Sequence, residues 1–127
     1  MTKCIFNGEM IDEDKASVRL NDLALLRGYG IFDFFRLEGS IPLFIDDHLD
    51  RFYQSAAGLR LPLSIEKSDL KLMIIEMLAA NKIHNSGVRL VLTGGASPNG
   101  YSIGSPTLFV RNEPLPQVPS NHFQHGI

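Results

Sequence analysis

An arginine near the middle of the chain is the side chain best suited to hold an anion. Arg51 lies in a segment with helical spacing, away from the strictly apolar positions. Its planar guanidinium can donate two parallel, charge-assisted hydrogen bonds, which suits the oxygens of a phosphate. His48 lies one turn earlier and could position such an arginine. A solvated arginine paired with Asp47 or Asp50 explains the same spacing, so the residues alone leave both interpretations open.

A second group of polar side chains lies in a segment rich in glycine, serine and proline. Residues 94–101 predict a loop whose polar positions are Asn99 and Tyr101. The glycines do not have the GxxxxGK[ST] spacing of a phosphate loop. An ordinary surface loop and a ligand-binding loop both fit this segment.

No side chain of this sequence is predicted to be catalytic, and no metal site is predicted. A lysine that attacks a carbonyl needs a pKa lowered by desolvation or by a cationic neighbour. None of the five lysines has such a setting, and they are Lys3, Lys15, Lys67, Lys71 and Lys82. The four histidines are not spaced as zinc ligands.

Three segments before Arg51 have the composition of strands. Residues 3–11 predict a β-hairpin, because Asn7-Gly8 is a strong two-residue turn signal between apolar segments. The aromatic and branched residues from Gly30 to Leu37 predict a central strand. Residues 41–44 predict the return strand, and Pro42 indicates that it lies at an edge of the sheet. Between the hairpin and Gly30 the pattern is ambiguous, with a short strand and a helical turn around residues 23–26 expected.

Arg51 itself lies on the first of two predicted helices. Apolar residues recur at spacings of three and four, namely Ile45, Leu49, Phe52, Ala56 and Leu59. Asp46 or Asp47 is the expected N-terminal cap, and Gly58 is the expected stop.

A second helix and two strands complete the predicted order. The helix runs from about Glu66 to Asn81, with Ser64 as a candidate cap. Residues 88–93 and 108–110 predict strands. Strands, two helices and then strands indicate an α+β domain with an antiparallel sheet.

Composition excludes several classes of protein. Of 127 residues, 44% are hydrophobic and 20% are charged, as in a soluble globular domain. The net charge of −2, without a basic block, gives no nucleic-acid footprint. No window approaches the roughly 18 apolar residues of a membrane span. A lone cysteine, Cys4, and an N-terminus without a signal-peptide pattern indicate a cytoplasmic protein.

The last residues predict a domain boundary. Pro114, Pro116 and Pro119 favour a stiff, extended linker. We therefore expect an N-terminal domain over residues 1–113, an interdomain linker over residues 114–120, and the start of a missing C-terminal domain at residues 121–127.

Three motifs, in order, resemble the class IV aminotransferase family, which comprises the fold-type IV enzymes that depend on pyridoxal 5′-phosphate (PLP). Residues 27–33, Arg-Gly-Tyr-Gly-Ile-Phe-Asp, resemble the glycine-rich start of the family's first core strand. Residues 45–52 resemble its H-[LI]-x-R-[LF] helix, followed by the Ser55-Ala56 pair. Residues 88–95 resemble the strand that leads to its active-site loop. The motifs match nearly the whole chain at the right distances.

The resemblance implies a cofactor, partners and site residues. PLP would be the cofactor, with Arg51 binding its phosphate, in a two-domain subunit of a homodimer. Phe32 would line the substrate pocket, and Asn99 and Tyr101 would occupy loop positions that bind the substrate carboxylate, often from the neighbouring subunit. The family's catalytic lysine lies in the second domain, beyond residue 127. The resemblance therefore implies an N-terminal domain that is not active alone.

The resemblance leaves the substrate and the reaction open. Phe32 favours an aminotransferase acting on branched-chain or similar amino acids with 2-oxo acids, since D-amino-acid enzymes more often have tyrosine there. Those enzymes also have a basic residue where this chain has Asn99. The alternatives are the N-terminal domain of an aminodeoxychorismate lyase, or a non-catalytic module for dimerisation or binding.

Overall fold

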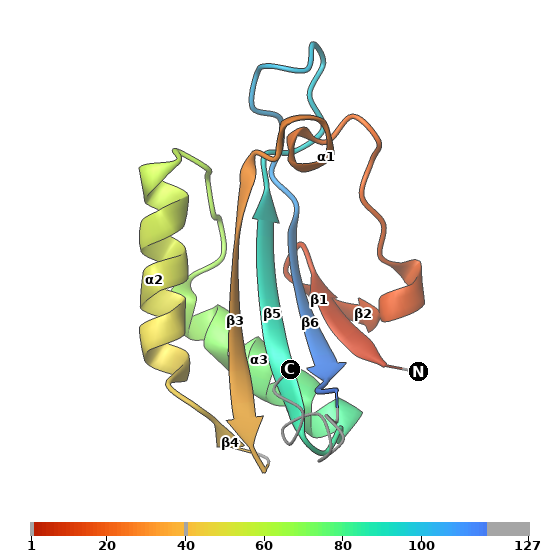
Figure 1. Cartoon of the computed structure of the whole chain (residues 1–127), viewed down its shortest axis with the longest axis vertical. Coiled ribbons are helices and arrows are strands. Elements are labelled where there is room, and N and C mark those ends of the chain that lie inside the picture. Colours follow the sequence, from red (N-terminus) through yellow and green to blue (C-terminus); the bar gives the residue numbers. More distant parts are fainter. Residues whose placement is uncertain (1, 40, 117–127) are drawn as a thin grey trace, which may run out of the picture.

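One antiparallel sheet organises the computed structural model, which describes residues 2–39 and 41–116. Its strands are β1 (Lys3–Phe6), β2 (Glu9–Asp12), β3 (Gly30–Glu38), β4 (Ile41–Pro42), β5 (Ser86–Thr93) and β6 (Leu108–Pro114). They form a six-stranded sheet in the order β2-β1-β6-β5-β3-β4 (Figure 1). Every neighbouring pair is antiparallel, which confirms the predicted α+β class.

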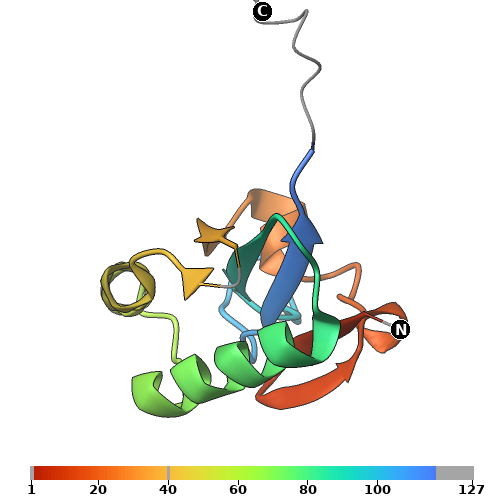
Figure 2. The same ribbon diagram turned by 90° about the horizontal axis from the view of Figure 1, so that it is seen from below.

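Two long helices cover one face of this sheet. The helices are α1 (Leu23–Arg27), α2 (Ile45–Gly58) and α3 (Lys67–Asn81), with a 3-10 turn at Glu13–Lys15. Helix α2 contacts β3, and α3 crosses behind β1 and β6 (Figures 1 and 2). On the opposite face, over β3, β5 and the near part of β6, neither of these long helices packs. We call this the open face.

The N-terminal hairpin forms as predicted. Asn7 and Gly8 have φ angles of 49° and 84°, the left-handed values that a two-residue hairpin turn requires. The pairing runs from Lys3 opposite Asp12 to Phe6 opposite Glu9. The helical turn expected around residues 23–26 is α1, but the short strand expected before it is absent, since Asp22 makes only an isolated bridge to Ala96.

The prediction that residues 30–37 form a central strand is wrong. Strand β3 is second from the edge, between β5 and the two-residue β4. Its aromatic residues reflect one buried face and one face that stays partly open, and composition alone does not separate these cases. The edge position predicted from Pro42 is confirmed, although the return strand is only Ile41–Pro42.

The helix boundaries agree with prediction better than the caps do. The N-cap of α2 is Phe44, in the left-handed conformation with φ of 56°, and no side chain caps this end. Asp46 and Asp47 lie instead within the first turn, where carboxylates complement the helix dipole. Helix α3 begins after Glu66 and not after Ser64.

The core lies between the sheet and the two helices. Helix α2 buries Ile45, Leu49, Phe52 and Ala56, which confirms its predicted apolar face. Helix α3 buries Leu70, Ile74 and Met77. From β3, Phe35 and Leu37 join this cluster.

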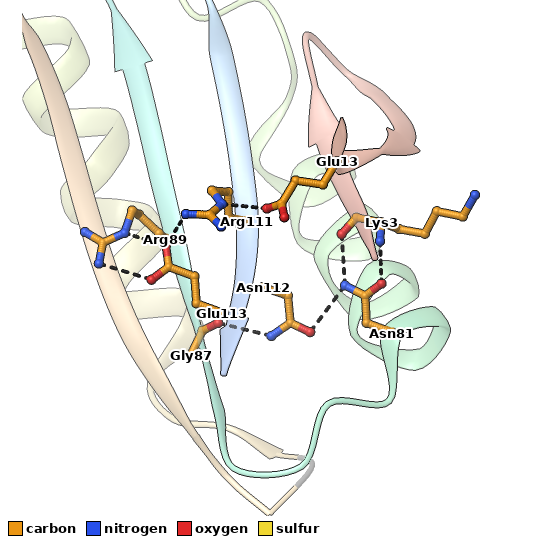
Figure 3. Close-up of polar contacts among 8 residues, drawn as sticks. All are labelled: Lys3, Glu13, Asn81, Gly87, Arg89, Arg111, Asn112 and Glu113. Carbon is orange, nitrogen blue, oxygen red and sulfur yellow. Dashed lines mark hydrogen bonds and ion pairs between the residues drawn. The ribbon is translucent and has the colours of Figure 1, made fainter. Parts of the chain in front are cut away.

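Polar contacts tie the outer elements to the sheet (Figure 3). On the helical side, Asn81 of α3 donates to the Lys3 carbonyl oxygen and accepts from the Lys3 amide, at 2.9 and 2.6 Å. On the open face, Glu113 pairs with Arg89 and Arg111, and Arg111 pairs with Glu13. These ion pairs extend across the open face from β5 to the 3-10 turn.

The predicted linker lies mostly beyond these elements. Strand β6 ends at Pro114, where the linker was expected to begin. Residues 117–120 of that linker, and residues 121–127, lie outside the described residues.

The packing of α2 gives a prediction for stability. Phe52 is 1% exposed, so Phe52→Ala should lower the free energy of unfolding by about 3–5 kcal/mol. Leu72→Ala is the control, because Leu72 is 60% exposed and its truncation should change stability by no more than about 0.5 kcal/mol. Urea denaturation measures both. Equal effects of the two substitutions would show that α2 does not pack on the sheet as described.

Candidate functional site

A buried aspartate of β3 forms the centre of the candidate site. Residues 33, 35 and 37 face the helices, so the Asp33 carboxylate points from the sheet toward α2 and is only 6% exposed. Arg51 of α2 donates to it from both edge nitrogens, from Nε to Oδ2 at 2.8 Å and from Nη2 to Oδ1 at 2.7 Å. The amide of Phe34 also donates to Oδ1, at 2.8 Å. The carboxylate therefore holds the guanidinium in a two-point fork.

His48 completes the cluster from one turn earlier on α2. Its Nδ1 lies 3.0 Å from Asp33 Oδ1 and 3.0 Å from Arg51 Nη2. Depending on its tautomer, this nitrogen donates to the carboxylate or accepts from the guanidinium. The ring packs on Phe35, with centroids 5.2 Å apart. His48 thus borders the ion pair, in the positioning place that the sequence suggested.

Opposing influences set the pKa of Asp33. Burial is the largest, and it acts to raise the pKa. Hydrogen bonds from Arg51, His48 and the Phe34 amide, with the charge of Arg51, act in the other direction and hold the pKa below the ordinary value of an aspartate. The hydrogen bond to Asp33 in turn raises the pKa of Arg51. The pair is therefore ionised at neutral pH.

Arg51 keeps an open edge despite this pairing. Its side chain is 64% exposed, whereas that of Asp33 is nearly covered. The alternative in which Arg51 pairs with Asp47 or Asp50 is wrong, since Asp33 is the partner and Asp50 pairs with Lys67. Among the described residues, the hydrogen bonds of Arg51 use Nε and Nη2, so the two hydrogens of Nη1 remain for another acceptor. A phosphate oxygen fits this donor set.

Phe32 points to the opposite face of the sheet. Its side chain is 70% exposed and its backbone pairs with Val91 of β5. On the same face, the half-buried ring of Phe34 carries the guanidinium of Arg89, whose Cζ lies 5.0 Å from the ring centroid. Phe32 therefore belongs to an open, partly aromatic surface, separated from Arg51 by the sheet.

Asn99 and Tyr101 lie in the loop between β5 and β6, beside α1 (Figure 1). Asn99 Oδ1 accepts from the amides of Tyr101 and Ser102, each at 2.8 Å, so its amide group stabilises the turn. Tyr101 is 74% exposed, with the guanidinium carbon of Arg27 4.8 Å from its ring centroid. Within the described part of the chain, neither residue contacts Arg51.

The lysines occupy surface positions, as expected. Four of the five pair with aspartates, and these are Lys3, Lys15, Lys67 and Lys71. Across residues 2–39 and 41–116, no cluster of three or more metal-ligating side chains occurs. In the same part of the chain, no helix has the length and apolar character of a membrane span.

Sequence analysis did not identify Asp33 as a site residue. It noticed the acid only as the last member of the glycine-rich motif. The available signal was its parity, since Asp33 shares a strand face with the apolar Phe35 and Leu37. A buried acid on that face requires a partner, and the histidine and arginine of α2 supply one.

Known proteins resemble this chain over most of its length. The model of the amino-transferase class IV family matches residues 30–125. A protein of Methanocaldococcus jannaschii assigned as a branched-chain-amino-acid aminotransferase is 32% identical over 119 residues, which is 91% of this chain and 41% of that protein. A D-alanine aminotransferase of Staphylococcus haemolyticus is 32% identical over 106 residues, 84% of this chain and 38% of the enzyme.

Two further comparisons bear on the reaction and the fold. An aminodeoxychorismate lyase of Bacillus subtilis is 30% identical over 97 residues, 75% of this chain and 33% of the enzyme. The crystal structure of a thermophile branched-chain amino acid aminotransferase with pyridoxamine 5′-phosphate superimposes with a TM-score of 0.79 at 21% identity, over 94% of this chain and 42% of that one. The chain thus spans about two fifths of the length of its relatives, and its sheet and helices match the N-terminal part of the fold-type IV structure.

The lowered pKa of Asp33 predicts a specific loss of stability in acid. A group whose pKa is lower in the folded state stabilises the fold fully above its ordinary pKa, about 3.9 for aspartate, and loses this contribution as the pH falls through the lower folded value. In Asp33→Asn the side chain does not ionise. Its free energy of unfolding should therefore fall less than that of the wild type between about pH 5 and pH 2. Urea denaturation across this range tests the prediction, and identical pH dependence would contradict it.

Proposed function

This chain belongs to the amino-transferase class IV family, and we propose that it forms the part of a PLP-dependent aminotransferase that holds the cofactor phosphate. The observation that carries the proposal is the open edge of Arg51, fixed by Asp33 at the position where the family motif has its arginine. A solved relative contains pyridoxamine 5′-phosphate, which has the same phosphate group.

The donor set of this chain fits the phosphate end of PLP. Arg51 would bind phosphate oxygens through Nη1, while Asp33 and His48 hold the guanidinium from behind. PLP supplies the electron sink for chemistry at the amino-bearing carbon when it is bound. The contribution of these residues is to bind and orient. Proton transfer falls to the lysine that the family resemblance places in a further domain.

The open face of the sheet would form part of the substrate wall. Phe32 offers an exposed aromatic ring there, and Tyr101 projects from the loop next to the same end of the sheet. An apolar wall favours an apolar amino acid, so we propose branched-chain or similar amino acids with 2-oxo acids as substrates. Asn99 would act mainly by shaping the loop, because its oxygen is already bound by two amides. We further propose a cytoplasmic homodimer.

Aminodeoxychorismate lyase is the second candidate, because an enzyme with that activity is 30% identical to this chain. Substrate turnover by the protein as the cell makes it separates the candidates. Transfer from a branched-chain amino acid to 2-oxoglutarate is expected. Turnover of aminodeoxychorismate, with no transfer from any amino acid, would establish the lyase instead, and transfer from D-alanine alone would replace the proposed substrate class.

Arg51→Ala tests the phosphate site directly. Removing the charged partner should weaken the binding of PLP between about 30-fold and several hundred-fold, the usual range when a charged hydrogen-bonding partner is lost. Equilibrium dialysis against PLP measures the change. Arg111→Ala, which removes an arginine from the other side of the sheet, is the control and should retain PLP. Unchanged PLP binding by Arg51→Ala would show that Arg51 is a surface residue only.

A further inference from the structure

We propose that Asp33 is the positioning residue of the phosphate site: it grips the inner edge of Arg51 and so directs the outer edge of the guanidinium toward the anion. The inference rests on the proposed function, since it concerns the same anion. It assigns a role to a buried carboxylate that does not itself contact the ligand.

The hydrogen bonds of Arg51 show which donors the anion would meet. A guanidinium carries five N–H groups. The Nε hydrogen and one Nη2 hydrogen are taken by the two oxygens of Asp33, and His48 Nδ1 lies beside Nη2. Within residues 2–39 and 41–116, no acceptor contacts Nη1. The anion is therefore offered the Nη1 end of the fork, in one orientation.

Asp33 is able to impose that orientation because it is itself fixed. Its backbone belongs to β3 and pairs with Leu90 of β5, and its carboxylate is buried against α2 and accepts from the Phe34 amide. A surface arginine without such a partner samples many rotamers, and ordering it on binding lowers affinity. The carboxylate removes that loss before the ligand arrives.

Net charge cannot replace this effect. With a neutral His48 ring, the carboxylate and the guanidinium cancel, so affinity must come from directed donors. Asp33→Asn would leave Arg51 uncompensated, which strengthens the undirected attraction of anions at low salt. High salt screens that attraction and leaves the loss of direction visible. The two consequences of the substitution therefore have opposite signs, and salt separates them.

The experiment uses the 127-residue chain with pyridoxine 5′-phosphate and pyridoxine as probes, since neither has an aldehyde that would react with lysines. Binding is followed through the Arg51 Nε–H signal in NMR titrations, and through equilibrium dialysis for Arg51 variants. In about 0.5 M potassium chloride, where the Debye length is roughly 4 Å, Asp33→Asn should bind pyridoxine 5′-phosphate roughly three- to tenfold more weakly than the wild type. Its affinity should also depend more steeply on salt, and the affinity for pyridoxine should not change.

Two further variants separate positioning from folding. Glu13→Gln is the control, because it removes a carboxylate from Arg111 across the sheet and should bind as the wild type does. The double variant Arg51→Ala/Asp33→Asn should bind as Arg51→Ala does, since Asp33 acts only through Arg51. A further loss in the double variant would overturn the proposal, because Asp33 would then act by another route.

The remaining outcomes distinguish this proposal from the proposed function. If Arg51→Ala weakens binding of the phosphate ester but Asp33→Asn binds as the wild type does at both salt concentrations, the positioning role is overturned alone. If the wild type shows no preference for the phosphate ester, or Arg51→Ala retains it, the proposed function fails. Should Asp33→Asn not fold, Arg51→Lys replaces it: lysine keeps the charge beside Asp33 but lacks the fork, and wild-type affinity in this variant would overturn the proposal.

Discussion

The alternation of side chains along β3 sets the layout of the candidate site. Asp33 and Phe35 face the helices, whereas Phe32 and Phe34 face the open side of the sheet. One strand thus supplies the carboxylate behind the phosphate-binding arginine and an aromatic ring on the opposite surface. A slip of one residue would exchange these two sets. Gly30 helps to fix the register, because a Cβ there would lie 2.9 Å from the Leu92 carbonyl oxygen.

Periodicity predicted the elements well and the environment of β3 poorly. The spacing of Leu49, Phe52 and Ala56 located α2 and placed Arg51 off its apolar face, and the structure agrees. Strand β3 is apolar on both faces in sequence, so period-two alternation gave no sign that Phe32 lies on an open surface. The same limit concealed Asp33, since its partner Arg51 lies 18 residues further along the chain. Pairing across that distance depends on how the helix packs, which no local pattern encodes.

The loop after β5 shows how one residue type supports two interpretations. Asparagine binds ligands through its amide, but it also stabilises turns by accepting backbone hydrogen bonds. In this loop Asn99 does the second, and Thr93 closes the base by accepting from the amides of Gly95 and Thr107. The predicted binding loop is therefore a preformed arm. Tyr101 is the side chain that this arm presents, with Arg27 against its ring.

Stability alone does not account for the Asp33–Arg51 pair. Burying a carboxylate carries a desolvation penalty that its partner often only offsets, and apolar residues of similar size commonly stabilise such positions as well or better. The pair is also asymmetric, with the acid covered and the base largely exposed. A buried acid beneath an exposed arginine fixes the direction of a cation that still faces outward. That arrangement suits a binding site, because it orders the donors before the anion arrives and leaves their outer edge free.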